Sequence, residues 1–241
     1  MSRLAVALAL TLAALPAALE AAGWERAYTG DDLVIDTRSV PASAVKELRA
    51  EGLLPAPPHV VRAVLADLER YPEFMPYVKV ARVLERETDG AVVAYLRLSF
   101  GALGLLGVTD RDYAIRIDER VTRSADGRTG YWREWNLADV PLPSSEDGSV
   151  VRVPVNRGYW DLRPAPADVA QTLGVYCLFI DPGGSLPAWA INRGNTQGVP
   201  KVYDAVRAAV REPRYAGATS APPAADASAS GATAGSPCAD R

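Results

Sequence analysis

The stretch TLGVYCLFIDPGGSLP, residues 172–187, decides the fold, because it reads as a buried strand that ends sharply before a last helix. Residues 173–180 are an apolar run with β-branched and aromatic members. The DPGG segment at 181–184 ends the strand, since proline lacks a backbone donor and glycine accepts positive φ. We expect Ser185 to cap the helix that follows, with Pro187 in its first turn. Strand, turn and helix together predict a curved sheet that grips one long helix and encloses a cavity.

Turn signals divide the chain before this stretch into short strands and one helix. Residues 24–29, 33–40 and 45–51 are predicted strands. An amphipathic helix is expected over residues 59–68, and Tyr71-Pro72 should end it.

A second group of strands is predicted between this helix and residue 172. They cover residues 78–88, 91–100, 108–121, 130–138, 149–155 and 159–163, with a turn at 156–158. Asp-Gly pairs at 89–90, 126–127 and 147–148 mark hairpins. The pattern indicates a mainly antiparallel meander, and we expect the last helix to bend near residues 198–200, where Gly198 and Pro200 stand.

Residues 1–23 have the pattern of a signal peptide. Arg3 precedes an apolar stretch over residues 4–15 that is short for a membrane span, and small residues at 21–23 suit a cleavage site. An uncleaved anchor is the alternative. We therefore expect an exported protein, periplasmic or extracellular, whose mature chain begins near Trp24.

The remaining chain is predicted to hold one folded domain, residues 24–212, followed by a disordered tail. Residues 213–241 are rich in Ala, Ser, Pro and Gly and contain few groups able to offset the entropy cost of ordering. The two cysteines, Cys177 and Cys238, could form a bridge after export. Two lone cysteines are no disulfide framework, however, and packing in the apolar strand is sufficient to explain Cys177.

Composition restricts the class of partner. The chain has 241 residues, 49% hydrophobic, with a formal net charge of −3 and a single histidine, His59. This charge, without a basic run, argues against nucleic acid as a partner. One histidine excludes a His-rich metal site and makes a catalytic triad improbable, so we expect no metal, no cofactor and no catalytic residue.

The strand at residues 109–118 gives the most specific polar signal. Alternation places Arg111, Tyr113 and Ile115 on one face and the aspartates at 110, 112 and 118 on the other. A guanidinium in the apolar phase needs a partner, because burying it unpaired is costly. Two interpretations stay open: an ion pair with Asp110 or Asp112, or a cation in a cavity. Arg97 falls in the polar phase of the preceding strand and is expected to be solvated.

Apolar and aromatic residues also have two interpretations each. The aromatic side chains Trp135, Trp160 and Tyr176 could line a pocket or simply form the core. Residues 101–108 (GALGLLGV) could pack beneath the last helix, form the rim of a pocket, or dip into a membrane.

Several motifs, in this order, resemble the START family of steroidogenic acute regulatory protein-related lipid transfer domains. The resemblance covers residues 24–211, and its motifs are DRDY at 110–113, VR at 151–152, GYW at 158–160, TLGVY at 172–176 and DPGGSLP at 181–187, with Trp189 and Asn192 after them. It implies an α+β helix-grip fold, in which a curved antiparallel sheet wraps around a long C-terminal helix over an internal apolar cavity. In some relatives the arginine that matches Arg111 pairs with an acid on the neighbouring strand, but residues 92–100 contain none here.

The function implied by this resemblance is binding, with transfer, of a lipid or sterol-like hydrophobic small molecule, without catalysis. We expect a monomer that contacts a membrane transiently. The predicted ligand-binding residues are Arg111, Tyr113, Ile115, Trp135, Trp160, Tyr176 and Trp189. Two alternatives remain: an aromatase/cyclase-type enzyme of the same superfamily that recruits Arg111, Tyr113 and Tyr176, and an interaction module with a filled core.

Overall fold

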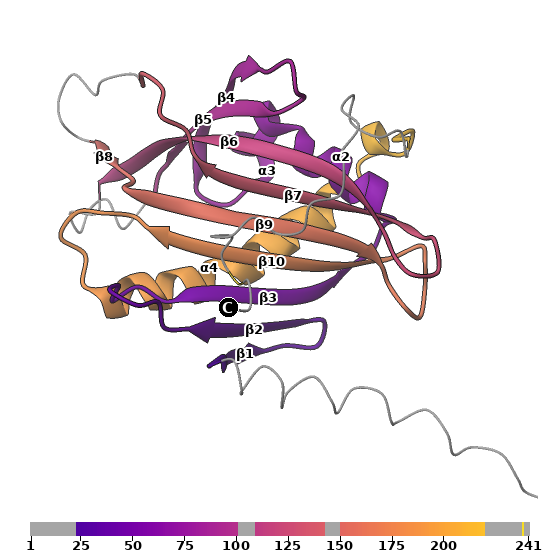
Figure 1. The fold of residues 1–241 in the computed structure, drawn as a ribbon, viewed down its shortest axis with the longest axis horizontal. Coiled ribbons are helices and arrows are strands. Elements are labelled where there is room, and N and C mark those ends of the chain that lie inside the picture. Colours follow the sequence, from indigo (N-terminus) through magenta and orange to yellow (C-terminus); the bar gives the residue numbers. More distant parts are fainter. Residues whose placement is uncertain (1–22, 101–108, 143–149, 220–237, 239–241) are drawn as a thin grey trace, which may run out of the picture.

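The computed structural model describes residues 23–100, 109–142, 150–219 and Cys238, and they form one curved sheet packed against helices (Figure 1). The strands are β1 (Glu25–Thr29), β2 (Leu33–Arg38), β3 (Glu47–Leu54), β4 (Val78–Arg86), β5 (Val92–Leu98), β6 (Asp110–Arg123), β7 (Thr129–Leu137), β8 (Val150–Arg152), β9 (Val155–Pro164) and β10 (Thr172–Asp181). Their order in the sheet is β1-β2-β3-β10-β9-β7-β6-β5-β4, and β8 lies off this path, parallel to β6. All other neighbours are antiparallel, as the turn signals predict.

One face of the sheet, called the inner face here, is covered by helices. These are α2 (Pro58–Ala66), α3 (Tyr71–Phe74) and the long α4 (Ala188–Ala209), with 3-10 turns at Leu68–Arg70 and Pro213–Tyr215. Figure 1 shows α4 running behind the sheet, on the same side as α2. The predicted helix-grip fold is confirmed.

Strand β10 joins the early and late parts of the chain. It pairs with β3 on one side and β9 on the other, so Tyr176 lies between Ala50 and Trp160. The turn after β10 has the predicted chemistry, because Gly183 and Gly184 both have positive φ, of 68° and 77°. This turn sends the chain across the inner face as α4.

The turn predicted at residues 156–158 is wrong, because β9 runs through these residues without a break. Gly158 is needed for close approach rather than for a turn: a Cβ there would lie 2.3 Å from the Trp135 ring and from the Cys177 carbonyl oxygen. A glycine in a strand interior commonly marks such an approach.

Two predicted helix boundaries also need correction. The chain does not leave helical geometry at Tyr71-Pro72, since Pro72 lies in the first turn of the new helix α3, where its missing donor costs little. Helix α4 begins at Ala188 with Pro187 as its N-cap residue, so Ser185 does not cap it. Pro200 is accommodated inside α4, which continues as one helix to Ala209.

The described part of the predicted tail is not free of structure. Tyr215 is buried, and its hydroxyl group donates a hydrogen bond to Asp67 over 2.9 Å. Cys238 forms a disulfide with Cys177, where the Cα atoms are 6.2 Å apart. Of the two interpretations of Cys177 that the sequence leaves open, a bridge after export and packing alone, the structure shows the bridge, between residues 61 positions apart in the sequence.

The two faces of the sheet have separate apolar clusters. The larger one lies between the inner face and the helices. Leu54, Val61, Leu162, Tyr203 and Val206 are among its most buried members. A smaller cluster on the outer face contains Trp24, Tyr159, Val175 and the disulfide, with Trp132 packed against it. Among the described residues, no helix is both long and apolar enough to span a bilayer.

Candidate ligand-binding cavity

A cavity of about 920 Å³ lies between the inner face of the sheet and the helices. Strands β5, β6, β7, β9 and β10 form one wall, and α2, the α3–β4 connection and the first part of α4 form the other. Most of its lining is aliphatic or aromatic. The sheet curvature and the long helix therefore leave space that the chain's own side chains do not fill.

Aromatic rings form a continuous wall on the sheet side. Tyr176 stacks on Trp135 with ring centroids 5.8 Å apart and contacts Trp160 at 4.6 Å. Trp160 in turn contacts Tyr203 of α4 at 5.2 Å. The hydroxyl group of Tyr203 donates to the Gly174 carbonyl oxygen over 2.8 Å, which ties the helix to β10. These contacts fix the rings that border the cavity.

Arg111 reaches the cavity from the start of β6 and is only 3% exposed. Its Nη1 donates to the carbonyl oxygen of Thr109 and, over 3.0 Å, to the Thr109 hydroxyl, and its Nη2 lies 3.5 Å from the Gly183 carbonyl oxygen. Its Nε has no hydrogen-bond partner among the described residues. Burial lowers the pKa of Arg111, although a guanidinium stays charged in proteins.

The aspartates that flank Arg111 are committed to other cations. Asp110 accepts from Arg97 Nε over 2.8 Å, and Asp112 accepts from Arg152 Nε over 2.7 Å. The ion-pair interpretation of Arg111 is therefore wrong, because alternation turns both carboxylates to the opposite face. The expectation that Arg97 is simply solvated is also wrong, for it forms this pair with Asp110.

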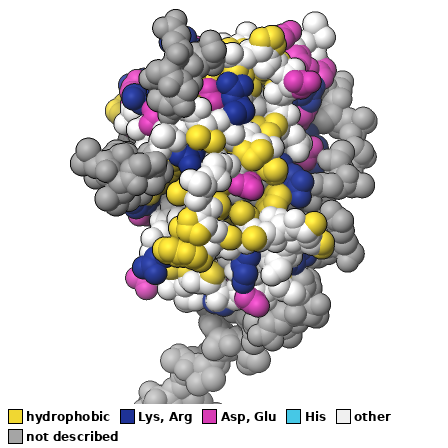
Figure 2. Space-filling view, turned by 90° about the vertical axis from the view of Figure 1, so that its left-hand side faces the viewer, with side chains coloured by type: hydrophobic (Ala, Val, Ile, Leu, Met, Phe, Trp, Pro, Cys, Tyr) yellow, Lys and Arg dark blue, Asp and Glu magenta, His cyan; other side chains and the backbone are white. Residues whose placement is uncertain are grey.

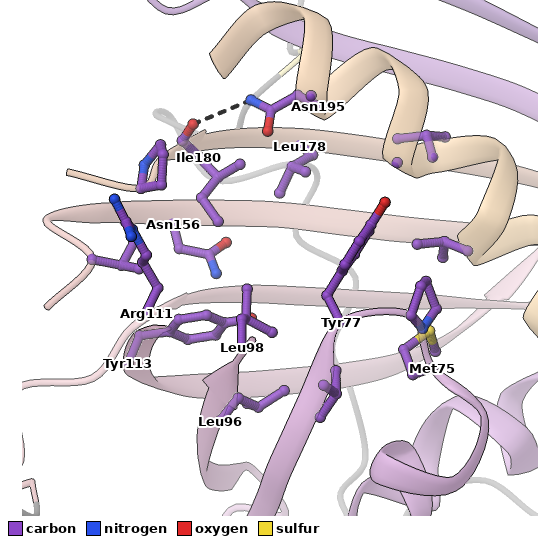
Figure 3. Close-up of a pocket in the computed structure, with 18 of the residues that line it drawn as sticks. Met75, Tyr77, Leu96, Leu98, Arg111, Tyr113, Asn156, Leu178, Ile180 and Asn195 are labelled. Atoms are coloured by element: carbon purple, nitrogen blue, oxygen red, sulfur yellow. Dashed lines mark hydrogen bonds between the residues drawn. The ribbon is translucent and has the colours of Figure 1, made fainter. Parts of the chain in front are cut away.

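Tyr113 and Asn156 extend the polar end of the cavity. Asn156 is buried, and its Oδ1 accepts from Trp135 Nε1 over 3.0 Å. Burial raises the pKa of the nearby Tyr113 hydroxyl group above its ordinary value, and the Asn156 side chain opposes this shift. Figure 3 shows Arg111, Tyr113 and Asn156 in one half of the cavity and Tyr77 and Met75 in the other.

Exposed aromatic side chains lie where the cavity meets the surface. Trp189, in the first turn of α4, lines the cavity and is 71% exposed. Tyr77 also lines it, with φ of 66°, a left-handed conformation that non-glycine residues rarely adopt. Lys201 of α4 donates to the Tyr77 hydroxyl group over 3.0 Å. On the face that carries the β10–α4 turn, hydrophobic side chains gather with charged ones around them (Figure 2).

The structure brings all seven sequence-predicted site residues to this cavity. Arg111, Tyr113, Ile115, Trp135, Trp160, Tyr176 and Trp189 all line it. Whether each contacts a ligand stays a prediction. The apolar segment 101–108 lies outside the described residues, as does the hairpin predicted at 147–148.

Sequence reasoning missed Asn156 and Tyr77. The sequence predicts a turn at Asn156, because Arg157 and Gly158 follow it. Tyr77 follows Pro76 in a segment without periodicity, so only its aromatic character could have suggested a role. Among the described residues, no cluster of His, Cys, Asp and Glu side chains could hold a metal ion.

Comparisons with known proteins agree with this geometry. A family model described as polyketide cyclase/dehydrase and lipid transport matches residues 54–207. The phosphatidylcholine transfer protein of Rattus norvegicus is 27% identical over 194 residues, which cover 79% of this chain and 86% of that protein.

Two solved structures are similar over most of the chain. The STAR-related lipid transfer protein fragment from Xanthomonas axonopodis has a TM-score of 0.66 and 26% identity, covering 79% of this chain and 99% of that one. Human StAR-related lipid transfer protein 5 has a TM-score of 0.64 and 19% identity, covering 78% and 86%, and shows the shared fold. Because the family model matches more than half of the chain, this protein belongs to the polyketide cyclase/dehydrase and lipid transport family, and its domain is START-like.

Proposed function

We propose that the protein binds a lipid or another hydrophobic small molecule in the cavity and transfers it without a catalytic step. The cavity itself carries this proposal, since about 920 Å³ with largely apolar walls is typical of small-molecule sites. Burying ~300 Å² of apolar ligand surface would contribute roughly 7 kcal/mol before the costs of association. The space also argues against an interaction module with a filled core.

The named relatives support the lipid part of the proposal. The rat protein is a phosphatidylcholine transfer protein, and the Xanthomonas protein is a STAR-related lipid transfer protein. Each of the two comparisons covers 79% of this chain.

A cyclase activity is the second candidate, because the family description names both functions. Such chemistry usually needs a general acid or base with a pKa near neutral. The described cavity lining contains no histidine, aspartate or glutamate. Burial raises the pKa of Tyr113 and Tyr176, so neither hydroxyl group is a good base at neutral pH. These observations favour binding over catalysis.

We propose further that the protein meets a membrane transiently through the cavity mouth. Trp189 offers a large exposed ring there, and Tyr77, which also lines the cavity, is 37% exposed. Amphipathic rings of this kind favour the membrane–water interface. In a vesicle co-sedimentation assay, Trp189→Ala should weaken association several-fold, while the matched substitution of an exposed residue away from the mouth, Val169→Ala, should not.

We also propose that the protein is exported, is a monomer and does not bind nucleic acid. The Cys177–Cys238 disulfide supports export, since disulfides persist in oxidising compartments. The net charge of −3 supports the exclusion of nucleic acid. Light scattering on the purified protein tests the monomer, and fractionation of the producing cells tests the location.

The main test is native mass spectrometry of the full chain, expressed with export, followed by organic extraction. A stoichiometric apolar molecule is expected to co-purify. A donor-to-acceptor vesicle assay should then show protein-dependent transfer of the extracted molecule. Protein that is empty and takes up no added fluorescent lipid would contradict the proposal.

A cavity-filling variant links binding to this cavity. Leu178 lines the cavity, so Leu178→Trp should fill part of it and reduce ligand occupancy. Leu84→Trp adds the same ring to an exposed position of β4 and should leave occupancy unchanged. Equal occupancy in both folded variants would place the ligand elsewhere.

A further inference from the structure

The charges that line the cavity are of one sign. Among the described residues, its ionisable lining consists of Arg111, Arg133, Lys201 and tyrosines, with no carboxylate. Arg133 is paired with Glu119, and Lys201 lies at the surface beside Tyr77. Arg111 is therefore the buried cation of this cavity that forms no ion pair within the described part of the chain.

The described groups that accept hydrogen bonds from Arg111 are all neutral. Among the described residues, its guanidinium hydrogen-bonds only the Thr109 carbonyl and hydroxyl oxygens and the Gly183 carbonyl oxygen, and its buried Nε–H has no partner there. The strand beside it, β5, holds no acid, and Asp110 and Asp112 pair with other arginines on the opposite face. A buried, unpaired charge is costly, and an added anion would offset that cost.

The position of Arg111 suits a ligand headgroup. It lies in the same half of the cavity as Tyr113 and Asn156, with Met75 in the other half (Figure 3). The apolar side chains of Leu65 and Leu68 also line the cavity. A molecule with one charged end and a long apolar body would match this division. A guanidinium is also well suited to carboxylate and phosphate oxygens.

We infer that the ligand of this cavity is an anionic amphiphile, whose carboxylate or phosphate oxygen accepts from Arg111 while its apolar part lies along the aromatic wall. The inference rests on the proposed function and specifies its ligand class. Neutral sterols and alcohols, although apolar, would leave Arg111 without a counter-charge.

The test compares three amphiphiles with the same chain length: hexadecanoate, hexadecyl phosphate and hexadecanol. Each displaces the neutral dye Nile red from the delipidated full-length protein, below its aggregation concentration. At least one of the two anions should bind ten-fold or more tightly than the alcohol. The tighter of the two anions identifies the headgroup chemistry.

Three variants assign the preference to Arg111. Arg111→Gln should weaken anion binding and so reduce the preference for the anion to less than three-fold, whereas Arg111→Lys should retain part of the preference. Arg157→Gln is the matched control, since Arg157 is a half-buried arginine that stacks on Phe179 outside the cavity lining. Arg157→Gln should keep the full preference. Circular dichroism checks that each variant is folded. If Arg111→Gln does not fold, Arg111→Lys replaces it as the test of the role of Arg111.

The outcomes separate this inference from the proposed function. Equal affinity for anions and alcohol in the unmodified protein would overturn the inference and leave hydrophobic binding in place. A full anion preference in folded Arg111→Gln would overturn the role of Arg111. Failure of all three amphiphiles to displace the dye would overturn the proposed function and the inference together.

Discussion

Strands β7 and β9 carry aromatic residues on both faces, and the two faces use them differently. On the outer face, Trp132 stacks on Tyr159 with ring centroids 4.0 Å apart, and Arg120, Trp24 and the disulfide lie around the pair. On the inner face, Trp135 and Trp160 contact Tyr176 but also border the cavity. The same residue types on the same strands thus complete a packed cluster on one side and line an open space on the other. What lies opposite the ring, and not the ring itself, decides between core and site.

The largest expected effect is on the inner face. Trp160→Ala should lower the free energy of unfolding by about 3–5 kcal/mol, because the ring contacts both Tyr176 and Tyr203 and is almost fully buried. Denaturant unfolding measures it. The outer counterpart Trp132→Ala should cost less, about 1–2 kcal/mol, since Trp132 is only half-buried. The reverse order would show that the cavity wall contributes little to stability.

Removing the disulfide measures how much the outer face contributes to stability, independently of the cavity. Cys238→Ala should lower the free energy of unfolding by about 2–4 kcal/mol, since the bridge closes a loop of 61 residues and so restricts the unfolded chain. Ligand affinity should change less than two-fold, because neither cysteine lines the cavity. A large loss of affinity would mean that the two faces are coupled.

The loss of stability at alkaline pH reports on a buried tyrosine, Tyr71, on the inner side of the sheet. Burial raises the pKa of Tyr71 to about 12 from an ordinary value of 10, so the unfolded chain loses this proton first. The contribution to stability is complete below pH 10 and falls as the pH rises towards 12, by at most ~3 kcal/mol for this residue.

Unfolding at pH 9 to 12 measures this effect against a variant. Tyr71→Phe should flatten the decline and cost about 1 kcal/mol at neutral pH, since the hydroxyl group donates to the Leu65 carbonyl oxygen over 2.7 Å. Substitution of the exposed Tyr28 by phenylalanine should leave the decline as it is. An unchanged slope in Tyr71→Phe would assign the alkaline loss to other groups.

The smallest expected effect on stability comes from removing the Tyr176 hydroxyl group at the cavity wall. The Tyr176 hydroxyl group forms no hydrogen bond with the described residues, so Tyr176→Phe should change the free energy of unfolding by less than about 0.5 kcal/mol. Any change in ligand affinity would then report a direct polar contact with the ligand. A clear loss of stability without ligand would show instead that the hydroxyl group has a structural role.

Local patterns in the sequence were enough for the fold and for one wall of the site. The apolar run of β10 and the DPGG turn predict the grip on α4, and alternation in β6 places Arg111, Tyr113 and Ile115 on the same face. These features depend on neighbours in the chain, which a sequence displays directly.

The features that were missed depend on contacts between distant segments. Gly158 is a glycine because the Trp135 ring approaches it, and Cys177 meets Cys238 across the outer face. Asn156 acquires its role only when β9 carries it beneath Trp135. Local propensity does not encode contacts between distant segments, so the sequence alone predicts a turn at Asn156 and leaves the pairing of Cys177 open.

Pro200 separates α4 into two parts that differ in how deeply their side chains are buried. Proline supplies no N–H to the Thr196 carbonyl group, and Gly194 and Gly198 further lower helix propensity before it. After Pro200, the helix is anchored by the buried Tyr203, Val206 and Ala209, whereas the half before it lies over the cavity with much less burial. Backbone amides before Pro200 should therefore exchange with solvent faster than those after it. The part of α4 over the cavity would then open locally to admit a ligand, while the part after Pro200 stays packed on the sheet.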